Sequence, residues 1–513
     1  MTGKIDISPE QLAIVQGILK GHLPKGTLAW AFGSRVTWTA KPFSDLDIAL
    51  EGAAPLAPDV LIDLEEAFDS SDLPWKVDVI DLNAVSPEFR EIVERQRVPA
   101  DWRFGRLGDF IELKRGYDLP AANREHGDIP IISSSGPTGF HNRSKVKARG
   151  VVTGRYGTIG QVFFVNEDFW PLNTTLYVRD FMGNDPKFIS YFLRGINFLA
   201  YSDKAAVPGV NRNDLHEAVV EVPDVAEQER IAWVLSALDD KIELNRRTNE
   251  TVEAMARAVF RDWFVDFGPT RRKAAGLTDP AAILGGLLPD PEKAAPLAAL
   301  FPDSFGANGL PEGWEEREVG DLCPIVGGGT PSTKEPAFWN GGTHNWATPK
   351  DLSKLSGLFL NETERQVTDA GLAKVSSGLS PVGSVLLSSR APIGYVAIAV
   401  KPVAVNQGFI VMQPAPAFPT EFAYFWTLEN LDLIKANANG STFQEISKKN
   451  FRPLLANHAG EDLVAKFAEV AEPMMDLIRN NEQENQTLAA TRDLLLPKLM
   501  SGDLRLTGTE GAT

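Results

Sequence analysis

Five residues near the N-terminus have the types and spacing of a phosphate-transfer site. Gly33 and Ser34 are followed, after ten intervening residues, by Asp45 and Asp47, and Asp78 lies in a later apolar segment. Alternate residues of a strand point to one face, so Asp45 and Asp47 should project together, and Asp78 on a neighbouring strand can complete a three-carboxylate cluster. Such hard oxygens bind Mg²⁺, which bridges nucleotide phosphates and stabilises the charge of nucleotidyl transfer. Gly33 would let the backbone approach a triphosphate, and Ser34 can donate to a phosphate oxygen.

These groups require strands to position them, and the segments DLDIAL at 45–50 and KVDVIDL at 76–82 predict two. Residues 1–97 are therefore expected to form an α/β domain. The spacing G-S-x(10)-D-x-D with a later aspartate resembles the minimal nucleotidyltransferases of the polymerase β superfamily, including antitoxin-type members. The resemblance implies a bound nucleoside triphosphate with Mg²⁺ if the domain is active. It assigns catalysis and metal binding to Asp45, Asp47 and Asp78, and nucleotide binding to Gly33 and Ser34.

A degenerate domain that keeps this fold without turnover is the open alternative. Trp38 stands where many members of the superfamily carry a small residue, which affects the shape of the nucleotide pocket. Asp59 and Asp81 are expected to be surface acids. Whether the chain is an enzyme is thus left open by the sequence.

Length and composition limit the number of domains, the cellular location and the DNA affinity that can be expected. A chain of 513 residues is expected to form three or more domains. The single cysteine, Cys323, cannot form an intrachain disulfide, and no apolar run is long enough for a membrane helix, so a cytoplasmic location without a membrane partner is expected. The net charge of −17 argues against strong nonspecific DNA affinity, although residues 101–223 carry a net charge of +1.

A long-range repeat organises the rest of the chain. VPADW at 98–102 with LGD at 107–109 matches LPEGW at 310–314 with VGD at 319–321, at an offset of 212, and the offset later becomes 236. The second copy is thus longer by 24 residues. Each copy runs from short strand-rich pieces, broken by Gly and Pro, into a long helix.

The helical part of each copy has apolar residues at alternating spacings of four and three. This heptad pattern starts at Ile231 in the first copy and at Phe467 in the second, and each is interrupted by two asparagines. Sustained heptads with buried Asn predict an antiparallel coiled coil whose register is set by polar pairs, and two unrelated amphipathic helices are the alternative. Pro473 is expected to kink or restart the second helix. The asparagines predicted to set the register are Asn245, Asn249, Asn481 and Asn485.

Residues 98–506 resemble the specificity subunits of type I restriction-modification systems. The resemblance rests on the two-fold plan and on two helical strings, which extend from Glu227 to Phe267 and from Asn481 to Leu504. It implies two target-recognition domains, each reading one half of a bipartite double-stranded DNA site. It also implies two long helices that separate these domains and dock methyltransferase subunits, expected to number two, with restriction or translocase subunits as further partners.

The fold class is therefore multidomain α+β. Its segments are expected at 1–97 (nucleotidyltransferase-like), 98–223 (first target-recognition domain), 224–267 (first helix), 268–309 (connector with one short helix at 280–288), 310–457 (second target-recognition domain), 458–506 (second helix) and 507–513 (tail).

Candidate DNA contacts are basic and amide side chains in the Gly-rich turns of the two recognition domains. Arg and Lys suit phosphates and guanine edges, and Asn suits adenine edges. They are Lys114, Arg115, Asn142, Arg143, Lys145, Arg155 and Arg212 in the first copy, and Lys334, Lys350, Arg390, Lys448 and Lys449 in the second.

Residues 98–513 contain no N-P-P-Y or D-P-P-Y string and no G-x-x-x-x-G-K-[ST] loop. Methylation and cleavage are therefore expected from partner subunits, and this part needs no cofactor. The rival hypothesis is that Mg-dependent nucleotidyl transfer to protein or RNA, as in antitoxin-type enzymes, is the main activity and the DNA module only addresses it. A third is a structural adaptor without DNA affinity.

Overall fold

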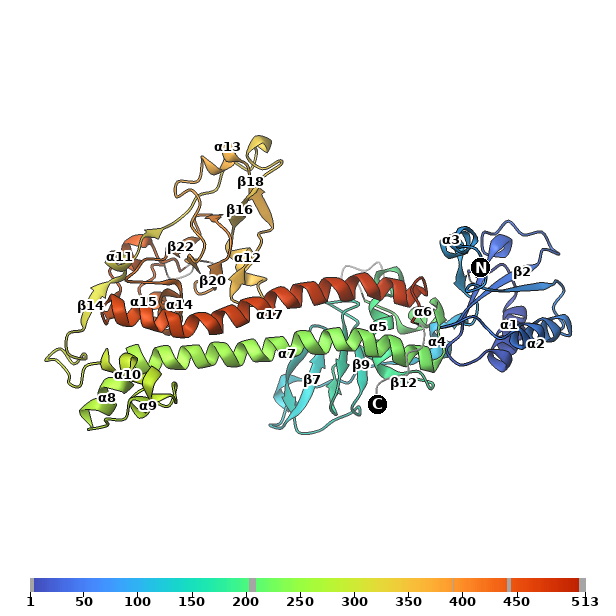
Figure 1. The fold of residues 1–513 in the computed structure, drawn as a ribbon, viewed down its shortest axis with the longest axis horizontal. Coiled ribbons are helices and arrows are strands. Elements are labelled where there is room, and N and C mark those ends of the chain that lie inside the picture. Colours follow the sequence, from blue (N-terminus) through green and yellow to red (C-terminus); the bar gives the residue numbers. More distant parts are fainter. Residues whose placement is uncertain (1–3, 203–208, 391, 441–443, 507–513) are drawn as a thin grey trace. The chain divides into compact units, whose positions relative to one another are not determined.

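The computed structural model describes residues 4–202, 209–390, 392–440 and 444–506, and the chain divides into two compact units (Figure 1). The first comprises Met1–Asp240 with Leu488–Thr513, and the second comprises Lys241–Thr487. The tail expected at 507–513 lies outside the described residues. No helix in the described ranges is both long and apolar enough to cross a membrane.

The first unit begins with a four-stranded sheet in the order β3-β2-β1-β4. β1 runs antiparallel to β2, and β2 runs parallel to β3. Ser8 caps the first helix through a capping box with Gln11, and buried Ile48, Leu50 and Leu64 belong to the core between sheet and helices. The elements are α1 (Pro9–His22), β1 (Leu28–Phe32), η1 (Gly33–Arg35), β2 (Leu46–Glu51), α2 (Pro58–Asp69), β3 (Val77–Asp81), α3 (Pro87–Gln96) and β4 (Val98–Pro99).

The first unit continues with a strand-rich region, here called head 1 (residues 103–222). It has a four-stranded sheet in the order β10-β9-β12-β6, a three-stranded sheet β11-β7-β8 and the pair β13-β5. Its elements are β5 (Arg103–Arg106), α4 (Leu107–Phe110), β6 (Glu112–Arg115), η2 (Ala121–Asn123), β7 (Ile129–Ser133), β8 (Gly136–His141), β9 (Gly150–Gly154), β10 (Val162–Val165), β11 (Trp170–Pro171), β12 (Thr175–Asp180), α5 (Pro186–Arg194), η3 (Phe198–Tyr201), α6 (Arg212–His216) and β13 (Val219–Val222).

The second unit contains head 2 (residues 315–458), whose strand order β15-β22-β19-β20 repeats that of head 1 and adds β17 at the edge. Its second sheet, β18-β16-β21, again has one parallel and one antiparallel neighbour. The elements are β14 (Glu315–Glu318), α11 (Val319–Leu322), β15 (Ile325–Val326), η4 (Pro336–Phe338), β16 (His344–Ala347), α12 (Pro349–Ser353), β17 (Phe359–Leu360), β18 (Arg365–Val367), α13 (Asp369–Leu372), β19 (Val385–Ser388), β20 (Val396–Ala399), β21 (Val403–Val405), β22 (Phe409–Met412), α14 (Thr420–Glu429), α15 (Leu431–Ala436), α16 (Lys448–Phe451) and β23 (Leu455–His458).

The extra length of the second copy lies mainly between β16 and β19. α12 and β17 occupy the connection from β16 to β18, where head 1 has only two residues between β7 and β8. The first and last strands of the heads keep the offsets of the sequence repeat, since β5 becomes β14 after 212 residues and β13 becomes β23 after 236. The repeat seen in the sequence is therefore a repeat of topology.

Residues 268–309 form three short helices rather than the single one expected. They are α8 (Gly268–Ala274), α9 (Pro280–Ile283) and α10 (Pro291–Ala299). Apolar side chains between the prolines give them a buried face, and Phe301 lies edge-on to Trp263 with ring centroids 5.2 Å apart.

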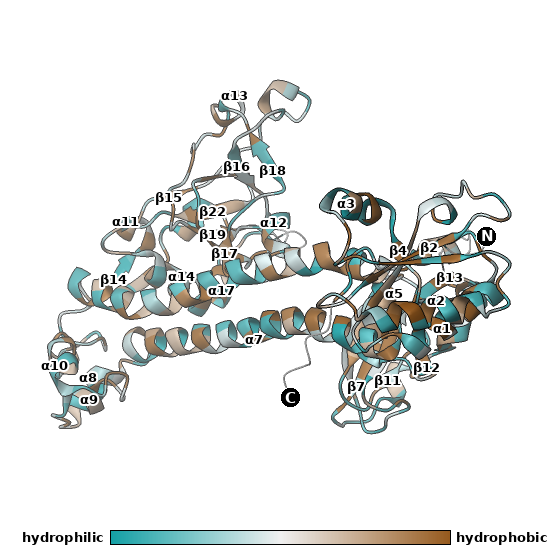
Figure 2. Cartoon of the chain, turned by 45° about the vertical axis from the view of Figure 1, so that its right-hand side comes forward, coloured by the Kyte–Doolittle hydropathy of each residue, from teal (hydrophilic) through white to brown (hydrophobic). Residues whose placement is uncertain are grey.

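Two long helices, α7 (Val225–Phe264) and α17 (Glu461–Ser501), each contribute to both units. Hydrophobic and hydrophilic residues alternate along both (Figure 2), and every predicted heptad position is buried or half-buried. The restart expected at Pro473 is wrong, because α17 runs through it without interruption. Ala471 and Met475 are buried on either side, and this packing outweighs the one backbone hydrogen bond that proline removes.

The same junction is built once in each head. A Cβ on Gly108 would lie 3.1 Å from Cβ of His216, and a Cβ on Gly320 would lie 2.8 Å from Cβ of Arg452. Glycine at both positions thus lets the short helix after the first strand pack closely on α6 or α16.

Candidate functional sites

The fold brings the predicted carboxylates to one end of the N-terminal sheet. Asp47 lies on β2 and is the direct cross-strand partner of Asp78 on β3, while Asp45 immediately precedes β2. Asp47 and Asp78 are half-buried and Asp45 is exposed. Gly33 and Ser34 open the turn that follows β1, the antiparallel neighbour of β2. Five residues chosen by spacing alone are therefore gathered by three adjacent strands.

Gly33 is required by both its conformation and its surroundings. Its φ is +76°, and a Cβ at this position would lie 2.1 Å from Oδ2 of Asp47. No side chain fits there without moving the carboxylate. Glycine here thus lets the carboxylate of Asp47 lie directly against the backbone of the turn.

The three carboxylates repel one another. Burial, and then the charges of Asp78 and Asp45, raise the pKa of Asp47 above its usual value. Lys76 offsets part of this charge through an ion pair with Asp78 at 2.6 Å. Within the described ranges no three acidic, His or Cys side chains already converge as a complete metal site. Carboxylate oxygens are the ligands that a divalent cation such as Mg²⁺ prefers, and a bound cation would relieve the repulsion.

Arg35 is a positioning residue that the sequence did not reveal. Its buried guanidinium donates to the carbonyl of Ser44 through Nε at 2.9 Å and Nη2 at 2.6 Å, and to the carbonyl of Asp6 at 2.9 Å. It therefore ties the turn at Gly33 to the residue before Asp45. Burial holds the pKa of Arg35 below its usual value.

The structure also places the other residues of this domain that the sequence singled out, which are Trp38, Asp59 and Asp81. Trp38 has φ of +57°, a left-handed conformation that is unfavourable for a bulky side chain, and its side chain is half exposed. Asp59 is exposed, as expected. The expectation that Asp81 is a surface acid is wrong, because Asp81 is buried and accepts hydrogen bonds from the backbone N–H groups of Leu56 and Asn83.

In head 1, four of the seven DNA-contact candidates lie in two groups. The ammonium groups of Lys114 and Lys145 lie 5.8 and 5.6 Å from the ring centre of Tyr117, and Lys145 also lies 5.1 Å from that of Trp170. Nothing in the sequence indicated that Tyr117 and Trp170 would lie beside these lysines. Arg155 donates to the carbonyl of Val210, which places it near the start of α6, where Arg212 lies.

Some candidates already have acidic partners. Arg115 pairs with Asp118 at 3.6 Å, and Asn142 donates to Glu125. Arg143 is exposed and makes no ion pair within the part of head 1 that the structure describes.

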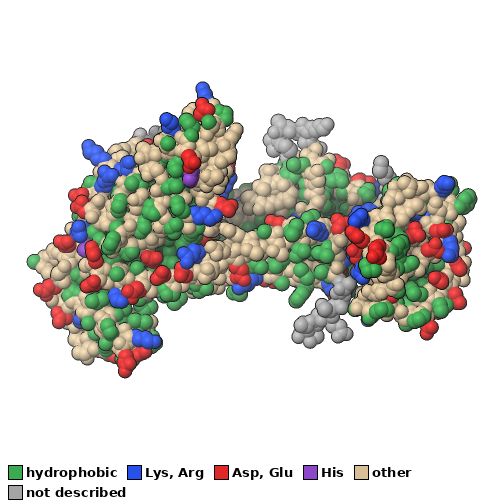
Figure 3. All heavy atoms as spheres, turned by 45° about the horizontal axis from the view of Figure 1, so that its top comes forward, with side chains coloured by type: hydrophobic (Ala, Val, Ile, Leu, Met, Phe, Trp, Pro, Cys, Tyr) green, Lys and Arg blue, Asp and Glu red, His purple; other side chains and the backbone are tan. Residues whose placement is uncertain are grey.

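In head 2, Lys448 and Lys449 open α16, the counterpart of α6, and both are exposed. Lys334 is also exposed. Lys350 pairs with Glu364 at 3.1 Å and Arg390 with Glu445 at 3.7 Å. Figure 3 shows Lys and Arg side chains scattered among Asp and Glu over the face drawn, without one continuous basic patch. The DNA-contact assignments remain predictions.

The four predicted asparagines meet in pairs within the second unit. Nδ2 of Asn245 donates to Oδ1 of Asn485 at 3.0 Å, and Nδ2 of Asn481 donates to Oδ1 of Asn249 at 2.8 Å. A later residue of α7 thus faces an earlier residue of α17, so the two segments are antiparallel. In the first unit Asp239 pairs with Arg492 at 2.7 Å in the same sense.

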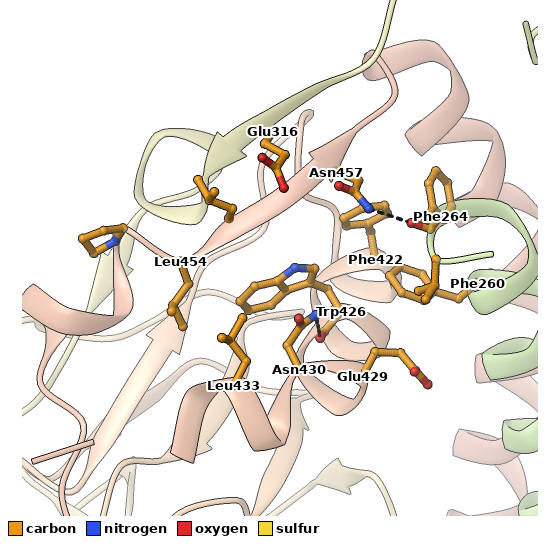
Figure 4. A pocket seen from close by; sticks show the side chains of 13 residues that line it. Phe260, Phe264, Glu316, Phe422, Trp426, Glu429, Asn430, Leu433, Leu454 and Asn457 are labelled. Carbon is orange, nitrogen blue, oxygen red and sulfur yellow. Dashed lines mark hydrogen bonds between the residues drawn. The ribbon is translucent and has the colours of Figure 1, made fainter. Parts of the chain in front are cut away.

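The second unit also holds a cavity of about 470 Å³ between α14, α15, β23 and the end of α7 (Figure 4). Its labelled side chains are mostly apolar, among them Phe260, Phe422 and Trp426. Glu429, on its wall, pairs with Arg257 at 2.5 Å. None of the predicted catalytic or DNA-contact residues lines it.

Comparisons with known proteins match both parts of the chain. The profile described as type I restriction modification DNA specificity domain matches residues 99–254 and 311–454. The chain is 35% identical over 181 residues to the type I restriction enzyme MjaIX specificity subunit of Methanocaldococcus jannaschii, covering 35% of this chain and 42% of that protein. The chain therefore spans less than half of that relative in this alignment.

The N-terminal part matches a second family. The profile described as polymerase beta, nucleotidyltransferase matches residues 15–98. Over 92 residues the chain is 48% identical to the probable protein adenylyltransferase MntA of Haemophilus influenzae, covering 18% of this chain and 80% of that protein.

A solved structure shares the fold of the larger part. The type I restriction-modification S subunit from M. genitalium superposes with a TM-score of 0.50 at 16% identity, covering 78% of this chain and 96% of that one. At this identity the likeness is one of fold.

Proposed function

The chain belongs to the type I restriction modification DNA specificity family, with a nucleotidyltransferase-family domain at its N-terminus, and we propose that it reads a bipartite DNA site for a restriction-modification complex. The observation that carries this proposal is the double match, since the family profile covers both copies of the repeat and the two heads share one strand order. One head for each half-site is the simplest use of such a duplication.

The heads supply recognition and the partners supply chemistry. Lys, Arg and Asn side chains in the turns of each head suit phosphate and base-edge contacts. The paired helices α7 and α17 offer repeated surfaces for docking methyltransferase subunits. The acidic balance of the whole chain implies that most of the DNA affinity comes from the assembled complex.

Mapping methylated bases in the host genome tests this proposal. Cells that carry the gene should show one methylated bipartite motif, and deletion of the gene alone should remove every occurrence of that motif. If the methylation pattern persists unchanged without the gene, the chain is not the specificity subunit.

The N-terminal site favours a second activity, the transfer of a nucleotidyl group to a protein hydroxyl. In such a reaction the acceptor oxygen bonds to the α-phosphorus of the nucleoside triphosphate, the bond to pyrophosphate breaks, and the hydroxyl proton passes to solvent or a carboxylate. Asp45, Asp47 and Asp78 would hold Mg²⁺, which neutralises phosphate charge when bound. The relation to a probable protein adenylyltransferase supports a protein acceptor, and RNA is the alternative.

Calorimetric titration with ATP and Mg²⁺ tests nucleotide binding. The wild-type chain should bind, and Asp45→Asn with Asp47→Asn should abolish metal-dependent binding, because the ligands of the cation are lost. Asp59→Asn is the matched control, since Asp59 is an exposed acid of the same domain, on α2. Equal binding by the double variant, or none by the wild type, would leave a degenerate scaffold.

A further inference from the structure

Arg505, just after α17, is the centre of a buried ionic cluster in the first unit. Its side chain is 2% exposed and pairs with Asp101 at 2.7 Å and with Glu227 at 2.5 Å. Glu227, in the first turn of α7, is also 2% exposed and accepts a hydrogen bond from Nε1 of Trp102 at 3.1 Å. We call Asp101, Glu227 and Arg505 the ionic triad.

The ionic triad reaches into the N-terminal domain. Nη1 of Arg505 donates to the carbonyl of Ala29 on β1 at 3.2 Å, and its guanidinium lies 5.2 Å from the ring centre of Trp30. A second contact joins the N-terminal domain to the end of α17, because Nζ of Lys4 donates to the carbonyl of Ser501 at 2.6 Å. One side chain thus joins β1, the linker after β4, the start of α7 and the segment after α17.

Close approach of these segments depends on Gly502. Its φ is +75°, and a Cβ at this position would lie 2.3 Å from Cγ of Pro99. The chain can therefore turn back from α17 onto β4 only with glycine here.

The second copy of the repeat lacks these charges. The offsets of 212 and 236 place Gly313 at the position of Asp101 and Leu463 at that of Glu227. The tryptophan is kept, and Trp314 packs on the rings of Phe264 and Phe267 with centroids 5.8 and 5.7 Å away. The second copy therefore packs this tryptophan against aromatic rings, where the first copy pairs it with Glu227 of the ionic triad. Buried ion pairs add little net stability, and their retention suggests that they specify one arrangement of the parts.

Gln228, the residue after Glu227, donates through Nε2 to Oδ1 of Asn184 in head 1 at 2.8 Å. We propose that Arg505 is a positioning residue which, through Asp101 and Glu227, joins the N-terminal domain, head 1 and the end of α17 into one cooperative unit. A ligand that stabilises the N-terminal domain then also stabilises head 1, by thermodynamic linkage. That consequence for nucleotide rests on the proposed nucleotide binding, whereas the cooperative unit itself does not.

Native-state hydrogen exchange of the full chain tests the cooperative unit. In the wild type the slowest amides of β1 and β2 should exchange through the same opening as those of β9 and β12, with protection factors within about threefold. In Arg505→Met the β1 and β2 amides should exchange more than about tenfold faster than those of head 1. Arg106→Met is the matched control, because it removes an exposed pair with Glu217 in head 1 and should leave the two sets together.

Arg505→Met leaves Asp101 and Glu227 without their cation and could misfold for that reason alone, so a second variant removes the carboxylates as well. Asp101→Gly, Glu227→Leu and Arg505→Met together remove all three charges and place the residues of the second copy at two positions. This triple variant should fold and should show separate opening of the two sets of amides. Common opening in the triple variant, or separate opening already in the wild type, would overturn the proposal.

Addition of ATP and Mg²⁺ separates this proposal from the proposed nucleotide binding. In the wild type the nucleotide should slow exchange in β9 and β12 as well as in β1 and β2, and in the triple variant only in β1 and β2. Protection confined to β1 and β2 in the wild type would contradict the coupling. Absence of protection in β1 and β2 would contradict nucleotide binding, and the ligand-free comparison would still decide the cooperative unit.

Discussion

Asn245 of α7 donates a hydrogen bond to Asn485 of α17 at 3.0 Å, and the pair of Asn481 and Asn249 forms the reciprocal bond at 2.8 Å. The repeat offset of 236 turns Asn245 into Asn481 and Asn249 into Asn485. Each bond is therefore the image of the other under the internal duplication. This relationship is that of a local two-fold axis across an antiparallel helix pair, produced within a single chain.

The asparagine pairs predict a specific pattern of coupling. Asn245→Ala should lower the free energy of unfolding of the second unit by about 1–3 kcal/mol, because it leaves the half-buried side-chain oxygen of Asn485 without this donor. Asn245→Leu with Asn485→Leu should recover most of this loss, because two apolar side chains pack in the seam. Urea unfolding of the single and double variants measures both effects, and Gln483→Ala, at an exposed position of α17, is the control.

A fully additive double-mutant cycle of Asn245→Leu, Asn485→Leu and the double variant would show that the two asparagines do not interact. Coupling energies between contacting residues are of the order of 0.5–3 kcal/mol, so the distinction is within reach of the measurement.

His216 packs on Gly108 in the first unit, where the second unit has Arg452 on Gly320. This difference predicts that the stability of the first unit depends on pH at this junction and that the stability of the second unit does not. Nε2 of His216 accepts a hydrogen bond from the backbone N–H of Leu113 at 2.9 Å, so the ring is neutral at Nε2. Burial, and then the charge of Arg212, hold the pKa of His216 below its usual value. The neutral form is thus favoured by folding, and its stabilising effect is full above about pH 6.5 and is lost as the pH falls through the lower folded pKa.

Unfolding of the first unit followed as a function of pH checks this. As the pH falls below about 6.5, the wild type should lose about 1 kcal/mol more of its free energy of unfolding than His216→Gln, because one part-buried hydrogen bond is lost. The second unit provides a natural comparison, because Nη2 of Arg452 donates to the carbonyl of Ile325 at 2.9 Å at the equivalent place. Identical pH profiles for wild type and His216→Gln would contradict the assignment.

The sequence predicted the parts of this fold that rest on local patterns. The heptad patterns that start at Ile231 and Phe467 lie within α7 and α17, because apolar spacing reflects a seam that must be buried. The strand-borne aspartates Asp47 and Asp78 proved to be direct neighbours on parallel strands, because side-chain alternation and strand pairing fix their faces.

Features that depend on distant contacts were not predictable. Pro473 was expected to interrupt a helix, and only the buried neighbours supplied by the tertiary fold show why it does not. Asp81 gave no sign that it accepts two backbone hydrogen bonds, one of them from Leu56, 25 residues earlier. The ionic triad joins residues up to 404 positions apart, and no spacing rule connects them.

Each head is proposed to read one half of a bipartite DNA site. The most direct measurement is a genome-wide map of methylated bases in cells whose only copy of this chain has residues 103–222 replaced by the corresponding head of another family member. We predict that one half-site of the methylated motif changes while the other half and the gap between them stay the same. A motif in which both half-sites change together, or neither changes, would contradict the claim.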